Sequence, residues 1–266
     1  MSSNISDGSV VSTDKAVRAA LVRYALRLGD DSLVLGQRLG EWCGHAPMIE
    51  VDLALTNLGL DLVGQATHFL TYAGEVEDEG RDADRLAFHR DVLDYANCLL
   101  VEQPNGDFAR TIARQFFFSH WQKLLLEGLS ASSDPTLAAI SRKAVKEVSY
   151  HVRFASEWMV RLGDGTEESR RRMVTAVDWC WRFVDELFEA DDVTRLLAAE
   201  GIGVNPASLR AAYDAAIDAV LAEATLARPA VRRGVAGGRT GRHSEHLGHL
   251  LAEMQFLPRA YPDAVW

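Results

Sequence analysis

The chain has 266 residues, of which 48% are hydrophobic, so it is long enough to bury a sizeable core. Its formal net charge of −10 argues against nucleic acid as a partner, because proteins that bind nucleic acid present a basic surface. The sequence contains no run of about 18 apolar residues, the length needed to cross a membrane. The N-terminus lacks the basic and apolar segments of a secretory signal. Cys43, Cys98 and Cys180 show no C-x-x-C spacing, which indicates free, buried thiols in a reducing compartment. We therefore expect an acidic, cytoplasmic protein.

The chain is predicted to be helical along most of its length. Residues 1–16 begin with a Ser-rich stretch and are expected to form a disordered tail, and residues 17–266 to form a single domain. Gly29 is expected to end the first helix, and Asp30 or Asp31 to cap the second. The predicted helices cover residues 15–28, 30–42, 49–75, 85–100, 108–129, 135–163, 167–189, 208–226 and 244–257.

Strand signals are almost absent, since there are no alternating Val/Ile/Thr runs joined by hairpin turns. The fold class is therefore predicted to be all-α. Four helices, near residues 30–43, 48–75, 107–129 and 135–162, are long enough to form a four-helix core with the other helices packed around it. The aromatic run Phe116–Phe118 with Trp121 exceeds what one helix face can bury, so this helix is expected to be covered on several sides, one possible cover being a partner subunit.

A polar stripe runs along the predicted helix over residues 49–72. Asn57, Asp61, Gln65 and His68 follow one another at steps of four, four and three, which places them on one side of a helix. The stretch contains no Lys or Arg. We therefore expect this helix to be buried on nearly all sides, with the stripe facing the middle of a bundle.

Bundle interiors of this kind hold di-iron sites, which take Glu from two helices and Glu-x-x-His from two others. The four core helices contain no Glu-x-x-His. After Asp61, Leu62 and Gln65 occupy the positions of the ligands, and Glu147 and His151 are four residues apart rather than three. The sequence therefore predicts neither a metal, nor a cofactor, nor catalytic residues in this chain.

A buried charge needs a partner, because an unpaired one costs several kcal/mol. Arg110, Arg114 and Lys143 are of the right type to pair with buried carboxylates. We predict that such pairs fill the space that metal occupies in a catalytic relative. The predicted polar network comprises Glu41, Asn57, Asp61, Gln65, His68, Arg110, Arg114, Lys143, Glu147 and His151.

Two further clusters have functional and structural interpretations. His246, His249 and Glu253, following His243, share one helix face and could bind zinc, although a His at the start of a helix is more commonly a surface or interface residue. The loop 232–242 carries four Arg but lacks the P-loop spacing. It could contact a phosphate of an acyl-CoA or an acidic partner, and a solvated loop is the favoured interpretation.

Several long segments resemble a known family. They are GDDSLVLGQRLGEWCGHAP (29–47), the helix 49–72, LLVEQPNGDFARTIARQ (99–115), AISRKAVKEVSYHVRF (139–154) and SEHLGHLLAEMQF (244–256). Together they resemble the C subunits of bacterial phenylacetyl-CoA epoxidases, which are multicomponent monooxygenases of phenylacetate catabolism. The resemblance runs from about residue 24 to 266, and His249 and the N-terminal extension depart from it.

The resemblance implies a ferritin-like four-helix bundle with additional packed helices and a non-catalytic, structural role in a hetero-oligomer. It implies that the sister A subunit of such a complex carries the di-iron centre and binds phenylacetyl-CoA. A reductase with FAD and an iron–sulfur cluster and a small bridging subunit would complete the complex. Two alternatives stay open: an independently active di-iron oxygenase, and a module that binds acyl-CoA through the Arg-rich loop.

Overall fold

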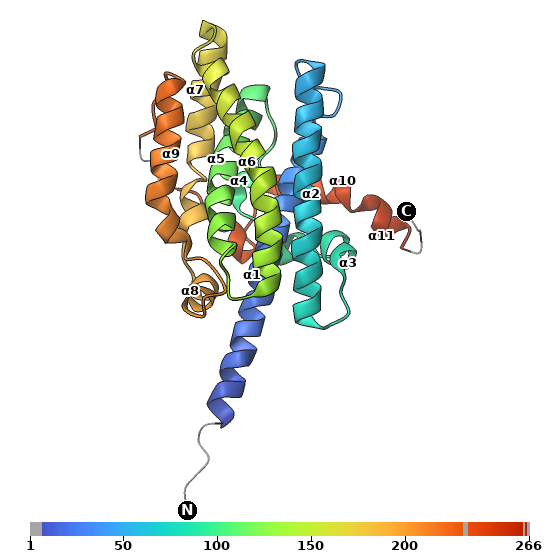
Figure 1. The fold of residues 1–266 in the computed structure, drawn as a ribbon. Coiled ribbons are helices and arrows are strands. Elements are labelled where there is room, and N and C mark those ends of the chain that lie inside the picture. The colour runs from blue at the N-terminus through green and yellow to red at the C-terminus, as the bar shows by residue number, and fades with distance from the viewer. Residues whose placement is uncertain (1–6, 231–233, 263, 265–266) are drawn as a thin grey trace, which may run out of the picture.

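The computed structural model describes residues 7–230, 234–262 and 264, and these residues form helices and connecting loops without any β-strand. The all-α prediction is confirmed, and the long helices form a ferritin-like four-helix bundle with additional helices around it (Figure 1). The α-helices are α1 (Asp7–Gly40), α2 (Ile49–Glu77), α3 (Ala83–Phe88), α4 (Leu99–Glu102), α5 (Phe108–Leu129), α6 (Pro135–Gly163), α7 (Glu167–Trp181), α8 (Asp192–Ala199), α9 (Arg210–Glu223), α10 (Glu245–Met254) and α11 (Phe256–Ala260). Short 3-10 turns are η1 (Val92–Asp94), η2 (Asp185–Phe188), η3 (Pro206–Leu209) and η4 (Gly238–Thr240).

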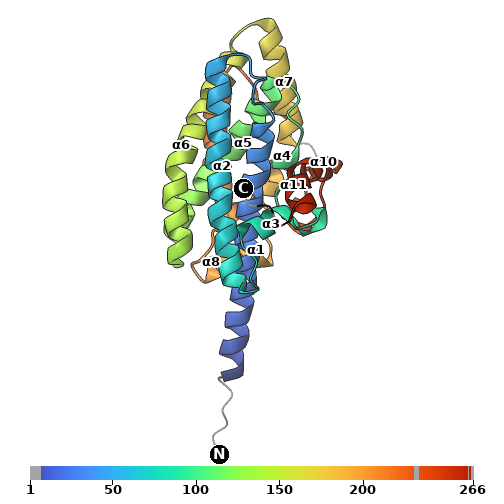
Figure 2. The same cartoon turned by 90° about the vertical axis from the view of Figure 1, so that its right-hand side faces the viewer.

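The bundle consists of two helix pairs. Helix α1 packs along α2, and α5 packs along α6. Helices α7 and α9 cover α5 on the side away from α2, while α10 and α11 extend from the opposite side of the molecule (Figures 1 and 2). The N-terminal part of α1 projects beyond the end of the bundle in both views.

Helix α1 is continuous through Gly29, Asp30 and Asp31, so the prediction of a helix boundary there is wrong. A Cβ atom on Gly29 would lie 2.7 Å from Leu70 Cδ2 of α2, so this glycine permits a close approach of the two helices rather than a stop. Both aspartates are buried and bind side chains from distant segments instead of capping a helix. Helix α1 also starts at Asp7, so residues 7–16 of the predicted tail are helical, and residues 1–6 lie outside the described residues.

Several predicted ends are correct because the capping signal is local. The Asp134 carboxylate accepts a hydrogen bond of 2.8 Å from Leu137 N, and Pro135 occupies the first position of α6. Other boundaries differ. The predicted helix over 85–100 is divided into α3, η1 and α4, the helix from 167 ends at Trp181, and the short helix α8 is absent from the prediction.

Helix α5 is the centre of the core. Phe116, Phe117 and Phe118 are all fully buried, and Trp121 is nearly so. Helices α6, α7 and α9 of the same chain cover α5, so its aromatic side chains need no partner subunit to be buried. Helix α2 is less enclosed than the sequence predicts, because Leu53 and Leu60 are 61% and 64% exposed.

Candidate functional site

Three pairs of polar side chains join α2 to α6. His151 Nε2 lies 3.0 Å from Asp61 Oδ2, Gln65 Nε2 donates to Glu147 Oε2 at 2.9 Å, and Lys143 Nζ lies 3.0 Å from His68 Nε2. From pair to pair the residue number rises along α2 and falls along α6, as expected for antiparallel neighbouring helices. The polar stripe therefore makes a seam between the two helices, with His151 and Gln65 buried and His68 and Lys143 exposed.

The inner positions of this seam have the wrong chemistry for two irons. Leu62 is fully buried, and the amide of Gln65 is held on both sides, because Gln122 Nε2 donates to Gln65 Oε1 at 3.0 Å. Within the described ranges, no three His, Cys, Asp or Glu side chains are grouped closely enough to hold a metal ion. An amide and an aliphatic side chain cannot replace bridging carboxylates, so the residues present do not fit a di-iron centre.

A second polar cluster forms where α1 ends and α5 begins. Arg38 Nη1 donates to Glu41 Oε1 at 2.7 Å, and Asn105 Nδ2 donates to Glu41 Oε2 at 2.9 Å. Arg114 is buried and donates to the Gln103 carbonyl and to Asn105 Oδ1. Burial lowers the pKa of Arg114 to about 10. Glu41 and Arg114 thus belong to one cluster, which is separate from the seam between α2 and α6.

Two members of the predicted network belong to neither cluster. The Arg110 guanidinium carbon lies 4.1 Å from the ring centroid of Trp179, a cation–π contact on the outer side of α5. Asn57 is exposed on α2. That these polar pairs fill the space that metal occupies in a catalytic relative stays a prediction.

A buried electrostatic network around Asp30 and Asp31 is absent from the sequence predictions. Asp30 binds Arg90 and accepts a hydrogen bond of 2.9 Å from Ala96 N, while Asp31 binds Arg239 and accepts one of 2.7 Å from Cys98 N. Each carboxylate therefore accepts a hydrogen bond from the backbone of the loop 95–98 and also binds an arginine. The sequence signal is the pair of adjacent aspartates, which is equally typical of a helix cap.

Two more buried carboxylates bind the segment that follows residue 234. Glu186 accepts hydrogen bonds from the backbone N–H groups of Leu99, Gly237 and Gly238, at 2.6, 2.9 and 2.8 Å. Glu102 accepts from Ser244 N at 2.6 Å and lies 2.7 Å from His243 Nδ1. Burial by itself would lower the pKa of His243, but its hydrogen bonds to Glu102 and to the Tyr95 carbonyl raise the pKa above its ordinary value.

The Arg-rich loop is therefore solvated only in part: residues 234–236, Thr240 and Arg242 are exposed, whereas Gly237, Gly238 and Gly241 are buried. Arg239 is largely buried, and a Cβ atom on Gly238 would lie 2.2 Å from the Asn97 carbonyl oxygen, so this glycine permits close backbone packing. Arg242 is exposed, and Arg232 and Arg233 lie outside the described residues. On α10, His246 is partly buried and His249 is exposed. His243 is bound to Glu102, and among the described residues His246, His249 and Glu253 are not grouped closely enough to hold a metal ion, so the zinc prediction is wrong.

The cysteines follow the prediction in two cases of three. Cys98 and Cys180 are buried, and burial raises the pKa of both thiols. Cys43 is exposed in the loop between α1 and α2, so the prediction of a buried thiol is wrong there.

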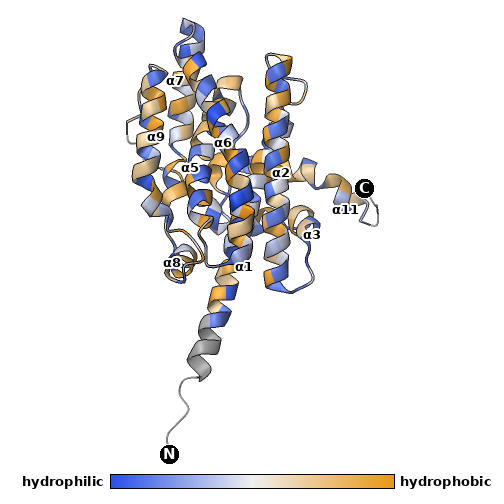
Figure 3. Ribbon diagram, in the orientation of Figure 1, coloured by the Kyte–Doolittle hydropathy of each residue, from blue (hydrophilic) through white to orange (hydrophobic). Residues whose placement is uncertain are grey.

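An exposed apolar stripe, hereafter the α2 stripe, lies on the outer face of α2. It consists of Ile49, Leu53, Leu60 and Val63, with exposed fractions from 43% to 77%. Apolar positions alternate with polar ones along the visible face of α2 in Figure 3. Several large apolar side chains exposed on one side of a helix are typical of a protein interface. No helix among residues 7–230 and 234–262 has the length and hydropathy needed to cross a membrane.

Comparison with known proteins agrees with the resemblance drawn from the sequence. Residues 9–266 match the family described as phenylacetic acid catabolic protein. The chain is also 55% identical, over 246 residues, to the C subunit of the 1,2-phenylacetyl-CoA epoxidase of Escherichia coli (strain K12). That alignment covers 92% of this chain and 99% of the relative, so the likeness extends over nearly the whole length of both.

Proposed function

This chain belongs to the phenylacetic acid catabolic protein family, and from that premise we propose that it is the non-catalytic, structural subunit of a phenylacetyl-CoA epoxidase. In this role it pairs with a di-iron catalytic sister subunit in aerobic phenylacetate catabolism and stabilises that subunit. A reductase with FAD and an iron–sulfur cluster, together with a bridging subunit, completes the complex. The proposed location is the cytoplasm.

The proposed non-catalytic role is supported by the side chains that meet between α2 and α6. Gln65 holds Gln122 and Glu147, and Asp61 holds His151, so the polar groups nearest to the ligand positions already bind one another. A metal ion would have to break these contacts and would find amide and aliphatic groups in place of carboxylates. No metal and no cofactor are therefore proposed for this chain.

The α2 stripe supports the pairing with a sister subunit. Leu53 and Leu60 lie two helical turns apart on the same face, and α6 leaves this face uncovered. Apolar surface removed from water stabilises a complex by about 25 cal/mol per Å². A sister subunit with the same bundle fold would offer a long helix face of matching length.

Metal analysis of the purified subunits tests the proposal. The chain is expressed alone and together with its catalytic sister subunit, and iron is measured in each preparation by elemental analysis. We expect only trace iron in the chain alone, and iron in proportion to the sister subunit in the complex. Stoichiometric iron and oxygen-dependent activity in the isolated chain would instead establish an independent di-iron oxygenase.

The third alternative, binding of acyl-CoA through the Arg-rich loop, has less support. Arg239 is already neutralised by Asp31, which leaves Arg242 as the exposed arginine in the described part of the loop. Calorimetric titration of the isolated chain with phenylacetyl-CoA provides the test. Binding that depends on Arg242 would favour the module over the structural role.

A further inference from the structure

The outer face of α6 is basic, although the formal net charge of the chain is −10. This helix carries five basic side chains and only two acidic ones, Glu147 and Glu157. All five basic side chains are exposed, and at 3.6 residues per turn they fall within about 100° around the helix axis. They form the α6 basic stripe, which comprises Arg142, Lys143, Lys146, Arg153 and Arg161.

The charges of the α6 basic stripe are not neutralised within the chain. Among residues 7–230 and 234–262, no carboxylate forms an ion pair with any of the five side chains. Arg142 donates to the Ser130 carbonyl at 3.0 Å, and Lys143 Nζ lies 3.0 Å from His68 Nε2, so both contact uncharged acceptors. The stripe therefore keeps its positive charge available to another molecule.

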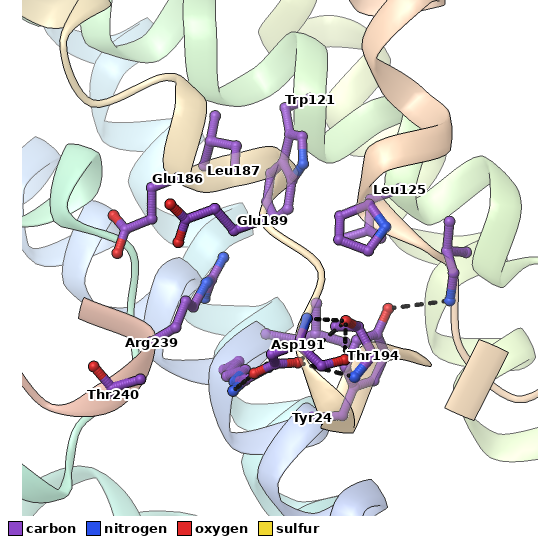
Figure 4. A pocket seen from close by; sticks show the side chains of 14 residues that line it. Tyr24, Trp121, Leu125, Glu186, Leu187, Glu189, Asp191, Thr194, Arg239 and Thr240 are labelled. Carbon is purple, nitrogen blue, oxygen red and sulfur yellow. Dashed lines mark hydrogen bonds and ion pairs between the residues drawn. The ribbon is translucent and has the colours of Figure 1, made fainter. Parts of the chain in front are cut away.

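Arginines on other elements do have carboxylate partners. On α7, Arg171 and Arg172 both bind Glu168, although all three side chains are more than half exposed. In the pocket between α1 and α8 that Figure 4 shows, Asp191 binds Arg27. Exposure alone therefore does not explain why no described carboxylate faces the basic side chains of α6.

Aromatic side chains lie next to the cations of α6. The Arg153 guanidinium carbon lies 5.3 Å from the ring centroid of Tyr150, which is 37% exposed. The Arg161 guanidinium carbon lies 5.2 Å from the ring centroid of Trp158. Such stacking orients a guanidinium while leaving its N–H groups free to donate. Arg, Tyr and Trp are also the residue types enriched at the centres of protein interfaces, so the composition of this face indicates contact with another protein.

The α6 basic stripe borders the helix that carries the α2 stripe. Lys143 and His68, which join the two helices, are both exposed, so the boundary between the helices reaches the surface there. Helices α2 and α6 lie side by side in Figures 1 and 2. In Figure 3, hydrophilic residues of α6 face the same side as apolar residues of α2. A protein that covers both helices would meet apolar side chains on α2 and positive charge on α6.

We propose that the α6 basic stripe and the α2 stripe belong to one interface, and that the sister subunit presents acidic side chains to α6. This inference rests on the proposed pairing and specifies the chemistry of the partner's face. Nucleic acid fits this surface less well, because the rest of the chain is strongly acidic and repels a polyanion. Opposite charges across an interface accelerate association and fix the orientation of the partners, and salt screens both effects.

The test measures the association rate constant of the purified full chain and the sister subunit at about 50 and about 500 mM NaCl. We expect the rate constant of the native chain to fall about tenfold between the two salt concentrations. The double variant Lys146→Glu/Arg153→Glu reverses two charges of the stripe. At low salt it should associate about tenfold more slowly than the native chain, and its rate constant should not fall when salt is added.

The double variant Lys15→Glu/Arg242→Glu is the matched control. It changes the net charge by the same amount at two exposed positions that lie on neither α2 nor α6. It should keep the native dependence of association on salt. Thermal unfolding should be unchanged in both double variants, because all four side chains are exposed.

Two kinds of result separate this inference from the proposed pairing. If the complex forms but its association does not depend on salt, or if the α6 variant and the control associate equally fast, the inference is wrong and the pairing stands. If the native chain forms no complex with the sister subunit at any salt concentration, the pairing is wrong, and the inference that rests on it is wrong as well.

Discussion

Asp31 of α1 and Arg239 of the C-terminal segment are 208 residues apart in the sequence and form a buried ion pair, with Arg239 Nη2 2.7 Å from Asp31 Oδ2. Asp31 also binds Cys98 N, and Arg239 also binds the Ala96 carbonyl. The pair therefore connects three segments of the chain that share no helix. It is one of several contacts that fix the C-terminal region to the bundle, beside those of Glu186 and Glu102.

Removal of Arg239 should destabilise the protein strongly. Arg239→Met leaves Asp31 buried without its cation, which typically costs about 3–5 kcal/mol. The free energy of unfolding in urea measures the effect. Arg242→Met is the control, since Arg242 lies three residues away but is exposed, and it should change stability by less than about 0.5 kcal/mol. Equal stability of the two variants would show that the ion pair does not hold this region.

Gln65 should be required for packing rather than for metal. Gln65→Met keeps the volume but leaves Gln122 Nε2 and Glu147 without their partner, so we expect a loss of about 1–3 kcal/mol in the free energy of unfolding. Asn57→Ala lies two turns earlier on the same helix at an exposed position and should be nearly neutral. A stable Gln65→Met protein would mean that the seam contributes little.

The α2 stripe should determine pairing with a sister subunit. Leu53→Glu and Leu60→Glu place charge in a face that the proposal buries, and each should weaken the complex about tenfold or more. Co-purification and analytical ultracentrifugation measure the loss, and the thermal unfolding of the chain alone should not change. Leu93→Glu is the control, because Leu93 is 78% exposed on η1, away from α2. If Leu93→Glu disrupts the complex and the α2 variants do not, the interface lies elsewhere.

His120 should contribute a stability that depends on pH. Burial, together with the nearby Lys123, lowers the pKa of His120 to about 4, and His120 Nε2 lies 3.1 Å from Ser156 Oγ. The unfolded chain binds this proton near pH 6.5 and the native protein only near pH 4. Stability from the neutral imidazole is therefore present above pH 6.5 and is lost as the pH falls toward 4, by up to about 3 kcal/mol.

Urea unfolding between about pH 4 and pH 7 measures this effect as the difference between the native chain and His120→Gln. The variant should show a smaller rise in stability with pH over this range. His243 has a raised pKa and contributes in the opposite direction, so its contribution cancels when the two proteins are compared. Parallel stability profiles would contradict a neutral, buried His120.

The three thiols should differ in reactivity. Cys43 is exposed, whereas Cys98 and Cys180 are buried with raised pKa values. A thiol reagent should therefore modify Cys43 rapidly in the native protein and the other two only after unfolding. Peptide mapping by mass spectrometry identifies the sites, and Cys43→Ser should abolish the rapid phase. Rapid modification of Cys98 would show that the loop 95–98 opens.

The sequence predicts local features well because their causes are local. Asp134 and Pro135 start α6 where the capping rules place it, and the spacing of Asp61, Gln65 and His68 predicts the side from which they meet α6. The prediction fails at Asp30 and Asp31 because a helix cap and a buried ion pair have the same local pattern. Only the position of Arg90 and Arg239 in space distinguishes them.

The exposure of α2 is a second case of this kind. An apolar helix without Lys or Arg is expected in a core, and half of α2 does face α1. The outer side also carries apolar residues, among them Leu53 and Leu60, but no helix in the described part of this chain covers them. The composition of a helix indicates how much of its surface is apolar. It does not indicate whether the same chain or another chain covers that surface.

The buried carboxylates also constrain the order in which the protein can be completed during synthesis. Asp31 is made before Arg239, which neutralises it and lies 208 residues later in the chain, and Glu186 is made before Gly237 and Gly238, whose backbone N–H groups donate to it. A nascent chain that has released α1 to α9 still contains acidic groups that water must solvate. These buried contacts of Asp31 and Glu186 can therefore form only after translation has passed residue 239.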